Sequence, residues 1–144
     1  MQLNQINQQL AKKGLKKTKP RQAILGALAH KSTWMTAKSL FEELSGQEAN
    51  IDFSTICRNL EILSNAGILC RVDRDSDGVF AYNLREMEEH HHHLICRSCG
   101  KISPMDFCPL QELNSSQTAG YSDLECRFEV YGCCRECQNK AHNI

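Results

Sequence analysis

The chain has 144 residues, 41% of them hydrophobic, which suits one modest domain or two small ones. No apolar stretch approaches the roughly 20 residues of a membrane-spanning helix, and the N-terminus lacks the apolar run of a signal peptide, so we expect a soluble cytoplasmic protein. The formal net charge is zero, but residues 1–85 carry 12 Lys/Arg against 8 Asp/Glu, and residues 86–144 carry 5 against 9. The basic first part favours a polyanion such as nucleic acid as partner, although a solvated charged face would look the same.

Helices are predicted over much of the first 65 residues. Residues 3–10 read as a short polar helix. Thr18 followed by Pro20 is typical of a helix start, because a Thr side chain caps free backbone N–H groups and proline suits the first turn. Apolar residues at helical spacing predict a further helix from Thr36 and another from Asp52 or Ser54.

The last of these helices separates apolar from polar side chains. Ile56, Leu60 and Leu63 form its buried stripe. The polar side chains away from the stripe are of the types that bind phosphates and base edges in DNA. With basic residues nearer the N-terminus, they make up the candidate DNA-contacting set: Lys16, Lys17, Arg21, Ser54, Thr55, Arg58 and Asn59.

A β-hairpin is predicted after this helix. Residues 69–73 and 79–84 read as strands, and the sequence Asp75-Ser76-Asp77-Gly78 between them is a strong turn signal. Three helices followed by a hairpin predict a winged helix, which is a DNA-binding fold. The alternative is a small helical core without a role in DNA binding.

Two C-x-x-C pairs, Cys96 with Cys99 and Cys134 with Cys137, indicate a metal site in the second part. Each pair on a tight turn directs both sulfurs to one point, and two pairs complete the tetrahedral four-sulfur site that zinc favours. The odd total of nine cysteines and the missing signal peptide argue against a disulfide framework. We therefore predict one structural zinc per chain. Redox-active or simply buried thiols are the alternative. Either Cys133 or Cys134 could be the zinc ligand at that position, and the C-x-x-C spacing favours Cys134.

Four consecutive histidines, His90 to His93, precede the first pair and lead into a predicted strand. Alternate side chains of a strand share a face, so His91 and His93 point one way and His90 and His92 the other. This predicts two different sites that each receive two imidazoles. A solvated histidine run is the alternative.

The remaining sequence predicts a strand–helix–strand unit. Residues 125–131 alternate as a strand, and residues 109–118 read as a helix with Leu110 and Leu113 turned inward. An exposed sheet edge in such a unit can dimerise by pairing with a second copy.

The pattern resembles the ferric uptake regulator (Fur) family across nearly the whole chain, and it is most similar to the zinc uptake regulator (Zur) subgroup. The segments that carry the resemblance are Thr18-Lys19-Pro20-Arg21, Phe53-Ser54-Thr55-Ile56-Cys57-Arg58-Asn59-Leu60, Ala66-Gly67-Ile68, His90 through Lys101, and Tyr131 through Cys137.

The resemblance implies an α+β protein that represses transcription as a homodimer on double-stranded operator DNA. It implies a winged-helix DNA-binding domain over residues 1–84, a hinge near residues 84–88, and a small metal-binding α/β dimerisation domain over residues 85–144. Metal at the hinge would lock the two DNA-binding domains at the operator spacing.

The sensed metal follows from the hinge ligands. Iron and peroxide sensors of the family commonly use a histidine from the second-helix region, where this sequence has Trp34. Zinc sensors instead take a ligand three residues after the glycine of the Ala-Gly pair, which here is Cys70, and a thiolate favours zinc over ferrous iron. The expected regulatory set is therefore Cys70, Glu86, His91 and His93, with zinc as the second bound metal. An iron- or peroxide-responsive regulator of the same family is the alternative.

Two departures from the family pattern concern cysteines. Cys57 stands where the family usually has tyrosine on the DNA-reading helix. Cys126 stands where the family often has a histidine ligand of another metal site. A candidate further site therefore comprises His90, His92, Cys108, Glu112 and Cys126, and the alternative is that the two cysteines are small core residues.

An enzyme is not expected. A catalytic zinc needs an open coordination position and a general base, and neither an H-E-x-x-H nor an H-x-E signature occurs. A thiol-redox switch that uses the surplus cysteines is a further alternative.

Overall fold

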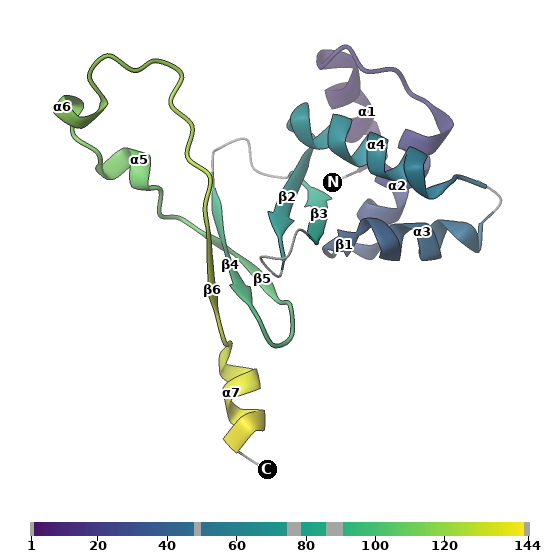
Figure 1. Cartoon of the computed structure of the whole chain (residues 1–144). Coiled ribbons are helices and arrows are strands. Elements are labelled where there is room, and N and C mark those ends of the chain that lie inside the picture. Colours follow the sequence, from purple (N-terminus) through teal and green to yellow (C-terminus); the bar gives the residue numbers. More distant parts are fainter. Residues whose placement is uncertain (1, 48–49, 75–78, 86–90, 143–144) are drawn as a thin grey trace. The chain divides into compact units, whose positions relative to one another are not determined.

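The computed structural model describes residues 2–47, 50–74, 79–85 and 91–142. The chain forms two compact units, Met1–Glu86 and Met87–Ile144 (Figure 1). Their boundary falls two residues after the position expected from the sequence. Within the described ranges, no helix is long and apolar enough to cross a bilayer.

The first unit is the predicted winged helix. Its elements are α1 (Leu3–Lys12), α2 (Lys19–Lys31), β1 (Met35–Thr36), α3 (Ala37–Ser45), α4 (Phe53–Asn65), β2 (Leu69–Asp73) and β3 (Phe80–Leu84). The strands form one antiparallel sheet in the order β1-β3-β2. The short strand β1, which pairs Met35 with Tyr82, was not expected. The predicted turn at residues 75–78 lies outside the described residues.

Side-chain caps explain where the helices begin. The Thr18 hydroxyl accepts a hydrogen bond from the backbone N–H of Arg21, and Thr36 and Ser39 form a capping box at the start of α3. The carboxylate of Asp52 accepts from the backbone N–H of Thr55 at 2.7 Å, which sets the start of α4. Each cap supplies a partner for an N–H group that the first turn of a helix leaves free.

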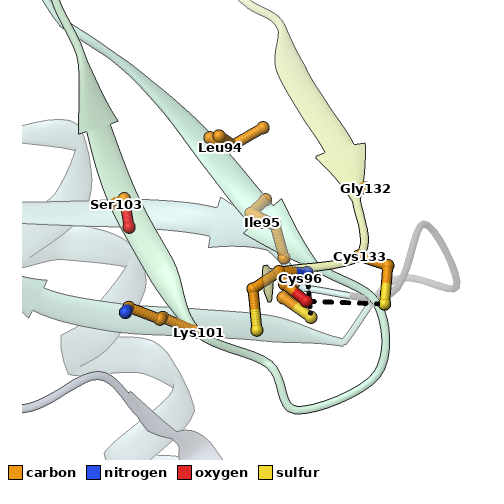
Figure 2. Close-up of a pocket in the computed structure, with 8 residues that line it drawn as sticks. Leu94, Ile95, Cys96, Lys101, Ser103, Gly132 and Cys133 are labelled. Atoms are coloured by element: carbon orange, nitrogen blue, oxygen red, sulfur yellow. Dashed lines mark hydrogen bonds between the residues drawn. The ribbon is translucent and has the colours of Figure 1, made fainter. Parts of the chain in front are cut away.

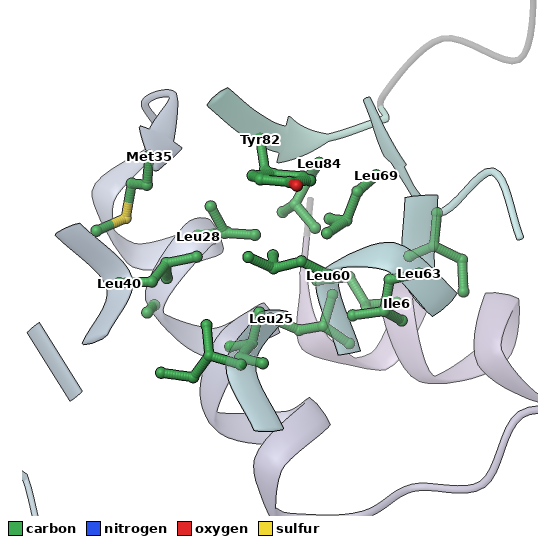
Figure 3. Packing of buried hydrophobic residues seen from close by; sticks show 14 of the residues in the cluster. Ile6, Leu25, Leu28, Met35, Leu40, Leu60, Leu63, Leu69, Tyr82 and Leu84 are labelled. Atoms are coloured by element: carbon green, nitrogen blue, oxygen red, sulfur yellow. The ribbon is translucent and has the colours of Figure 1, made fainter. Parts of the chain in front are cut away.

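The hydrophobic core of this unit lies between the helices and the sheet (Figure 3). Leu25 and Leu28 of α2 and Leu60 and Leu63 of α4 belong to this core, and all four side chains are fully buried. Tyr82 and Leu84 of β3 and Leu69 of β2 close the core on the sheet side. The core therefore fixes α4, the helix with the predicted DNA-facing residues, against the rest of the unit.

A polar brace adds to this packing. The Arg21 Nε donates to the Asn59 Oδ1 at 3.1 Å, and the Arg21 Nη1 donates to the carbonyl of Lys16 at 2.9 Å. The Asn59 amide nitrogen in turn donates to the carbonyl of Thr55. Asn59 is only 9% exposed, so its side chain links α2 to α4 from inside the unit.

The second unit is a small sheet with helices at its margins. Its elements are β4 (His92–Cys96), β5 (Ile102–Met105), α5 (Pro109–Glu112), α6 (Ser115–Thr118), β6 (Glu129–Gly132) and α7 (Arg135–His142). The strand order is β5-β4-β6, with β5 antiparallel and β6 parallel to the central β4.

Two expectations for this unit are wrong. The single helix predicted over residues 109–118 is two short helices, because Leu113 is extended and the Asn114 side chain caps a new start by accepting from Gln117. Leu113 is exposed rather than turned inward. The strand predicted over residues 125–131 begins only at Glu129, and residues 124–128 are irregular.

Removing the polar brace tests its part in placing α4. We expect Asn59→Ala to lower the free energy of unfolding of the first unit by about 1–3 kcal/mol, because it leaves the part-buried Nε of Arg21 without its acceptor. The matched control is Ser54→Ala on the exposed side of the same helix, which should stay within about 0.5 kcal/mol of the wild type. Equal effects of the two substitutions in urea unfolding would show that the brace contributes nothing.

Candidate metal centres

The four cysteines of the two C-x-x-C pairs come together in the second unit. Cys96 ends β4, and Cys99 lies on the following turn. Cys134 directly precedes α7, and Cys137 lies in the first turn of that helix. The sulfurs of Cys96 and Cys137 are 3.9 Å apart, and those of Cys99 and Cys134 are 3.8 Å apart. Four sulfurs bound to one zinc at about 2.3 Å would lie about 3.8 Å apart, so the spacing fits a tetrahedral zinc site.

Backbone N–H groups prepare this cluster for a cation. The N–H of Cys134 donates to the sulfur of Cys96 at 3.3 Å. This bond and a second one from the N–H of Cys99 lower the pKa of the Cys96 thiol to about 6. These hydrogen bonds favour the thiolate of Cys96, which is the form that binds metal.

Cys133 lies beside the four-cysteine group without belonging to it. The group contains Cys134, as the C-x-x-C spacing favoured, while Cys133 is exposed. Cys133 lines a pocket together with Cys96, Lys101 and Ser103 (Figure 2). Its thiol faces the carbonyl of Cys134 at 3.8 Å, so it neighbours the cluster without completing it.

The three described histidines of the run divide as strand geometry predicts. The rings of His91 and His93 meet edge to face with centroids 4.8 Å apart. The ring of His92 lies instead 4.0 Å from the ring of Phe128, which belongs to the segment before β6. His92 and His93 are both buried, so a solvated histidine run does not describe them. His90 lies outside the described residues.

The His92 side of the strand carries a second group of metal-ligand atoms. Ligand atoms of His92, Cys108 and Cys126 lie within 4.8 Å of one another. Glu112, which the sequence offered for the same site, does not belong to this group. Two thiols and an imidazole are soft donors that suit zinc better than ferrous iron or manganese.

The expected regulatory ligands are distributed over both units. Cys70 lies on β2 of the first unit, half-buried, and burial raises the pKa of its thiol, an effect that the nearby Arg85 partly offsets. His91 and His93 belong to the second unit. Glu86 lies outside the described residues, so the structure describes three of the four expected ligands.

The predicted DNA-facing residues differ in exposure. Ser54 and Arg58 are exposed on α4, where Cys57 and Glu61 share their face, and Thr55 is half-buried beside them. Lys16 and Lys17 are exposed before α2. Arg21 and Asn59 bond to each other within the unit, so their first role is to hold α4 in place.

Sequence reasoning missed several neighbours of these sites. Phe128 against His92 and the stacking of Arg97 on Tyr131, 5.2 Å from cation to ring centre, come from contacts between strands. Arg85, next to Cys70, lies 15 residues away in the chain. The register of β2 and β3 pairs Cys70 with Asn83, and Arg85 lies only two residues after Asn83. A correct prediction of this register would therefore have suggested that Arg85 lies near Cys70.

Comparisons with known proteins give a consistent result. The model of the ferric uptake regulator family matches residues 12–131. A peroxide-responsive repressor, PerR, of Staphylococcus aureus is 34% identical over 134 residues, which are 91% of this chain and 88% of that protein.

Solved structures agree on the fold. The ferric uptake regulator of Francisella tularensis with iron is 27% identical, with a TM-score of 0.66, over 87% of this chain and 96% of that one. A zinc uptake regulator in complex with zinc and DNA has a TM-score of 0.75 over 97% of this chain and 95% of that one, at 18% identity. The second likeness concerns the fold alone.

Neighbouring cysteines provide a direct test of the four-cysteine site. Cys96→Ser should lose the zinc of the purified protein and with it the fold of the second unit, because structural zinc contributes folding free energy directly. Cys133→Ser should keep one zinc per chain. Metal analysis by atomic emission reads both outcomes, and a Cys133→Ser protein without zinc would mean that Cys133 is a ligand in place of Cys134.

The ionisation of His93 gives a second test. Burial, followed by the neighbouring His91 and His92, lowers the pKa of His93 from 6.5 to about 4. The unfolded chain therefore binds more protons than the folded one between these values, and stability falls as pH decreases through this window.

We expect the His93 ring to remain neutral at about pH 5.5, where an ordinary histidine is about nine-tenths protonated. Nitrogen chemical shifts of the imidazole, assigned by their loss in His93→Gln, report the protonation state. A protonated ring at this pH would contradict the buried position of His93.

Proposed function

Because this chain belongs to the ferric uptake regulator family of metal-responsive transcription regulators, we propose that it is a zinc-responsive repressor that binds operator DNA. The observation that carries the choice of zinc is the thiol of Cys70 in the expected regulatory set. We further propose that it acts in the cytoplasm as a homodimer and has no enzymatic role.

The exposed face of α4 supports DNA binding. Ser54 and Arg58 lie four residues apart and share this face, so both can reach one groove. Arg58 supplies a planar donor for base edges or phosphates, and Lys16 and Lys17 add exposed positive charge before α2. Two copies of one such helix match the two half-sites of a palindromic operator, which supports a dimer.

The donor chemistry supports zinc as the signal. A thiolate from Cys70 with imidazoles from His91 and His93 is a softer set than ferrous iron prefers. His93 is neutral at physiological pH, so its lone pair is available to a metal. Cys70 is protonated there without metal, so binding must release its proton and should strengthen as pH rises.

A metal held by Cys70 of the first unit and by His91 and His93 of the second would restrain the two units with respect to each other. Glu86 is the proposed fourth ligand. Such a metal shifts the protein to its DNA-binding form only by binding that form more tightly. Zinc would then raise DNA affinity, because a larger fraction of dimers would hold their DNA-binding units in the arrangement that matches both half-sites.

An iron- or peroxide-responsive regulator is the second candidate. It is favoured by the 34% identity with a protein named as a peroxide-responsive repressor. It would need the histidine ligand that such sensors commonly take from the second-helix region, and Trp34, which stands at that position, cannot bind a metal.

The group formed by His92, Cys108 and Cys126 is proposed as a further zinc-binding position, with His90 as its fourth candidate ligand. Its support is the convergence of three soft donors beside a buried strand. Two buried or half-buried thiols packed as small core residues remain the alternative for this group.

The Cys70 thiol is the point at which the zinc proposal can fail. Cys70→Ala should keep the fold and the four-cysteine zinc but lose zinc-activated binding to operator DNA. Cys133→Ala, which removes an exposed thiol outside both groups of metal-ligand atoms, should keep zinc activation. Arg58→Ala should bind zinc normally and lose on the order of 1–3 kcal/mol of DNA-binding free energy.

Fluorescence anisotropy with labelled operator DNA, titrated with zinc and separately with ferrous iron under anaerobic conditions, measures these outcomes. The zinc proposal fails if Cys70→Ala responds to zinc like the wild type. It also fails if ferrous iron activates at a lower free concentration than zinc.

A further inference from the structure

The long connection from β5 to β6 in the second unit has almost no core of its own. Of residues 106–128, all of which the structure describes, Cys108 alone is buried. Most of its large apolar side chains are exposed, namely Phe107, Leu113, Tyr121 and Leu124, while Leu110 and Phe128 are half-buried. Hydrophobic packing within the chain therefore does little to hold the connection in place.

Contacts at the two ends of the connection hold it to the sheet. Cys108 stands before α5 and Cys126 lies just before β6, and their sulfurs lie within 4.8 Å of each other and of a ring nitrogen of His92. Phe128 packs on the ring of His92. Two thiols thus meet where the connection leaves the sheet and where it returns.

We propose that Cys108 and Cys126 are an oxidation site, at which a hydroperoxide converts the two thiols into a reversible disulfide that closes residues 108–126 into a loop. The inference goes beyond the proposed metal response, because it depends on neither the sensed metal nor Cys70. The disulfide is the oxidised, metal-free state of the group that we also propose as a further zinc-binding position, so zinc on these thiols and the disulfide exclude each other.

The exposure of the two thiols sets the order of the reaction. Cys126 is half-buried and Cys108 is buried, so a small peroxide reaches the sulfur of Cys126 first. That sulfur attacks one peroxide oxygen, the O–O bond breaks, and the thiol proton leaves with the other oxygen, as water when the oxidant is hydrogen peroxide.

The second step closes the loop. The sulfur of Cys108 attacks the sulfenic sulfur of Cys126, and the S–O bond breaks. The departing hydroxide takes the Cys108 proton and leaves as water. Two thiols are oxidised by two electrons in all, and hydrogen peroxide is reduced to two waters. Thiol reductants reverse the change by thiol–disulfide exchange.

The other thiols of the chain serve as internal references. The four cysteines of the zinc-type site would be ligated in the purified protein, which protects them. Cys57 is exposed on α4 of the first unit and belongs to neither group of metal-ligand atoms among the described residues. Cys57 should therefore oxidise or alkylate without forming an internal disulfide.

Trypsin makes the pair directly measurable. Residues 102–127 contain no internal Lys or Arg, so Cys108 and Cys126 fall on one tryptic peptide that holds no other cysteine. The full-length protein with one zinc per chain is treated with hydrogen peroxide, alkylated, digested without reductant and analysed by mass spectrometry. We expect this peptide about 2 Da lighter and unalkylated, with zinc retained and the change reversed by dithiothreitol.

Structural consequences give a second readout. Chymotrypsin should cut the exposed sites at Leu113, Tyr121 and Leu124 several-fold more slowly after oxidation, because the closed loop opens less often. Cys126→Ser should abolish both the lighter peptide and the protection. Cys57→Ser should keep both.

Three results would overturn the proposal. The first is that the peptide of residues 102–127 takes up two alkyl groups after peroxide treatment. The second is that its cysteines accumulate as sulfinic acid. The third is that zinc is lost before the peptide becomes lighter, which would place the reactive thiols at the four-cysteine site.

Discussion

The meeting of four sulfurs at tetrahedral spacing is the constraint on which the second unit depends. The hydrophobic core of the protein lies within the first unit, from Ile6 of α1 to Leu84 of β3. In the described part of the second unit, the buried side chains are Ile95, Cys96, Cys108 and two histidines. So few apolar groups do little to offset the loss of chain entropy, and a metal bound by Cys96 and its partners would supply folding free energy that this packing lacks.

Strand β4 connects this metal site with the other groups of ligands. It ends in Cys96, and backbone hydrogen bonds hold it between β5 and β6. The alternation of its side chains places His92 on one side with Cys108 and Cys126, while His93 turns to the other side and meets His91. A metal that orders the end of β4 therefore also orders the histidines that we propose as sensor ligands.

Local chemistry explains which features the sequence could predict. Thr18, Thr36 and Asp52 cap their helices through short-range bonds, so the starts of α2, α3 and α4 could be read directly. The period of a strand also separated His92 from His91 and His93 as predicted, while His90 lies outside the described residues. The break between α5 and α6 was missed because the capping side chain of Asn114 outweighed an apolar pattern that is typical of one continuous helix. The late start of β6 was missed because pairing with β4, and not the preference of the local sequence for a strand, sets where β6 begins. The burial of Asn59 depends on Arg21, 38 residues away, which no local pattern reveals.

Backbone hydrogen exchange before and after removal of zinc tests most directly whether a metal replaces the core of the second unit. We predict that chelation removes the protection of the amides in β4, β5 and β6, while those of α2 and α4, which rest on the apolar core, keep theirs. Protection that persists in β4 after all zinc has been removed would contradict this account.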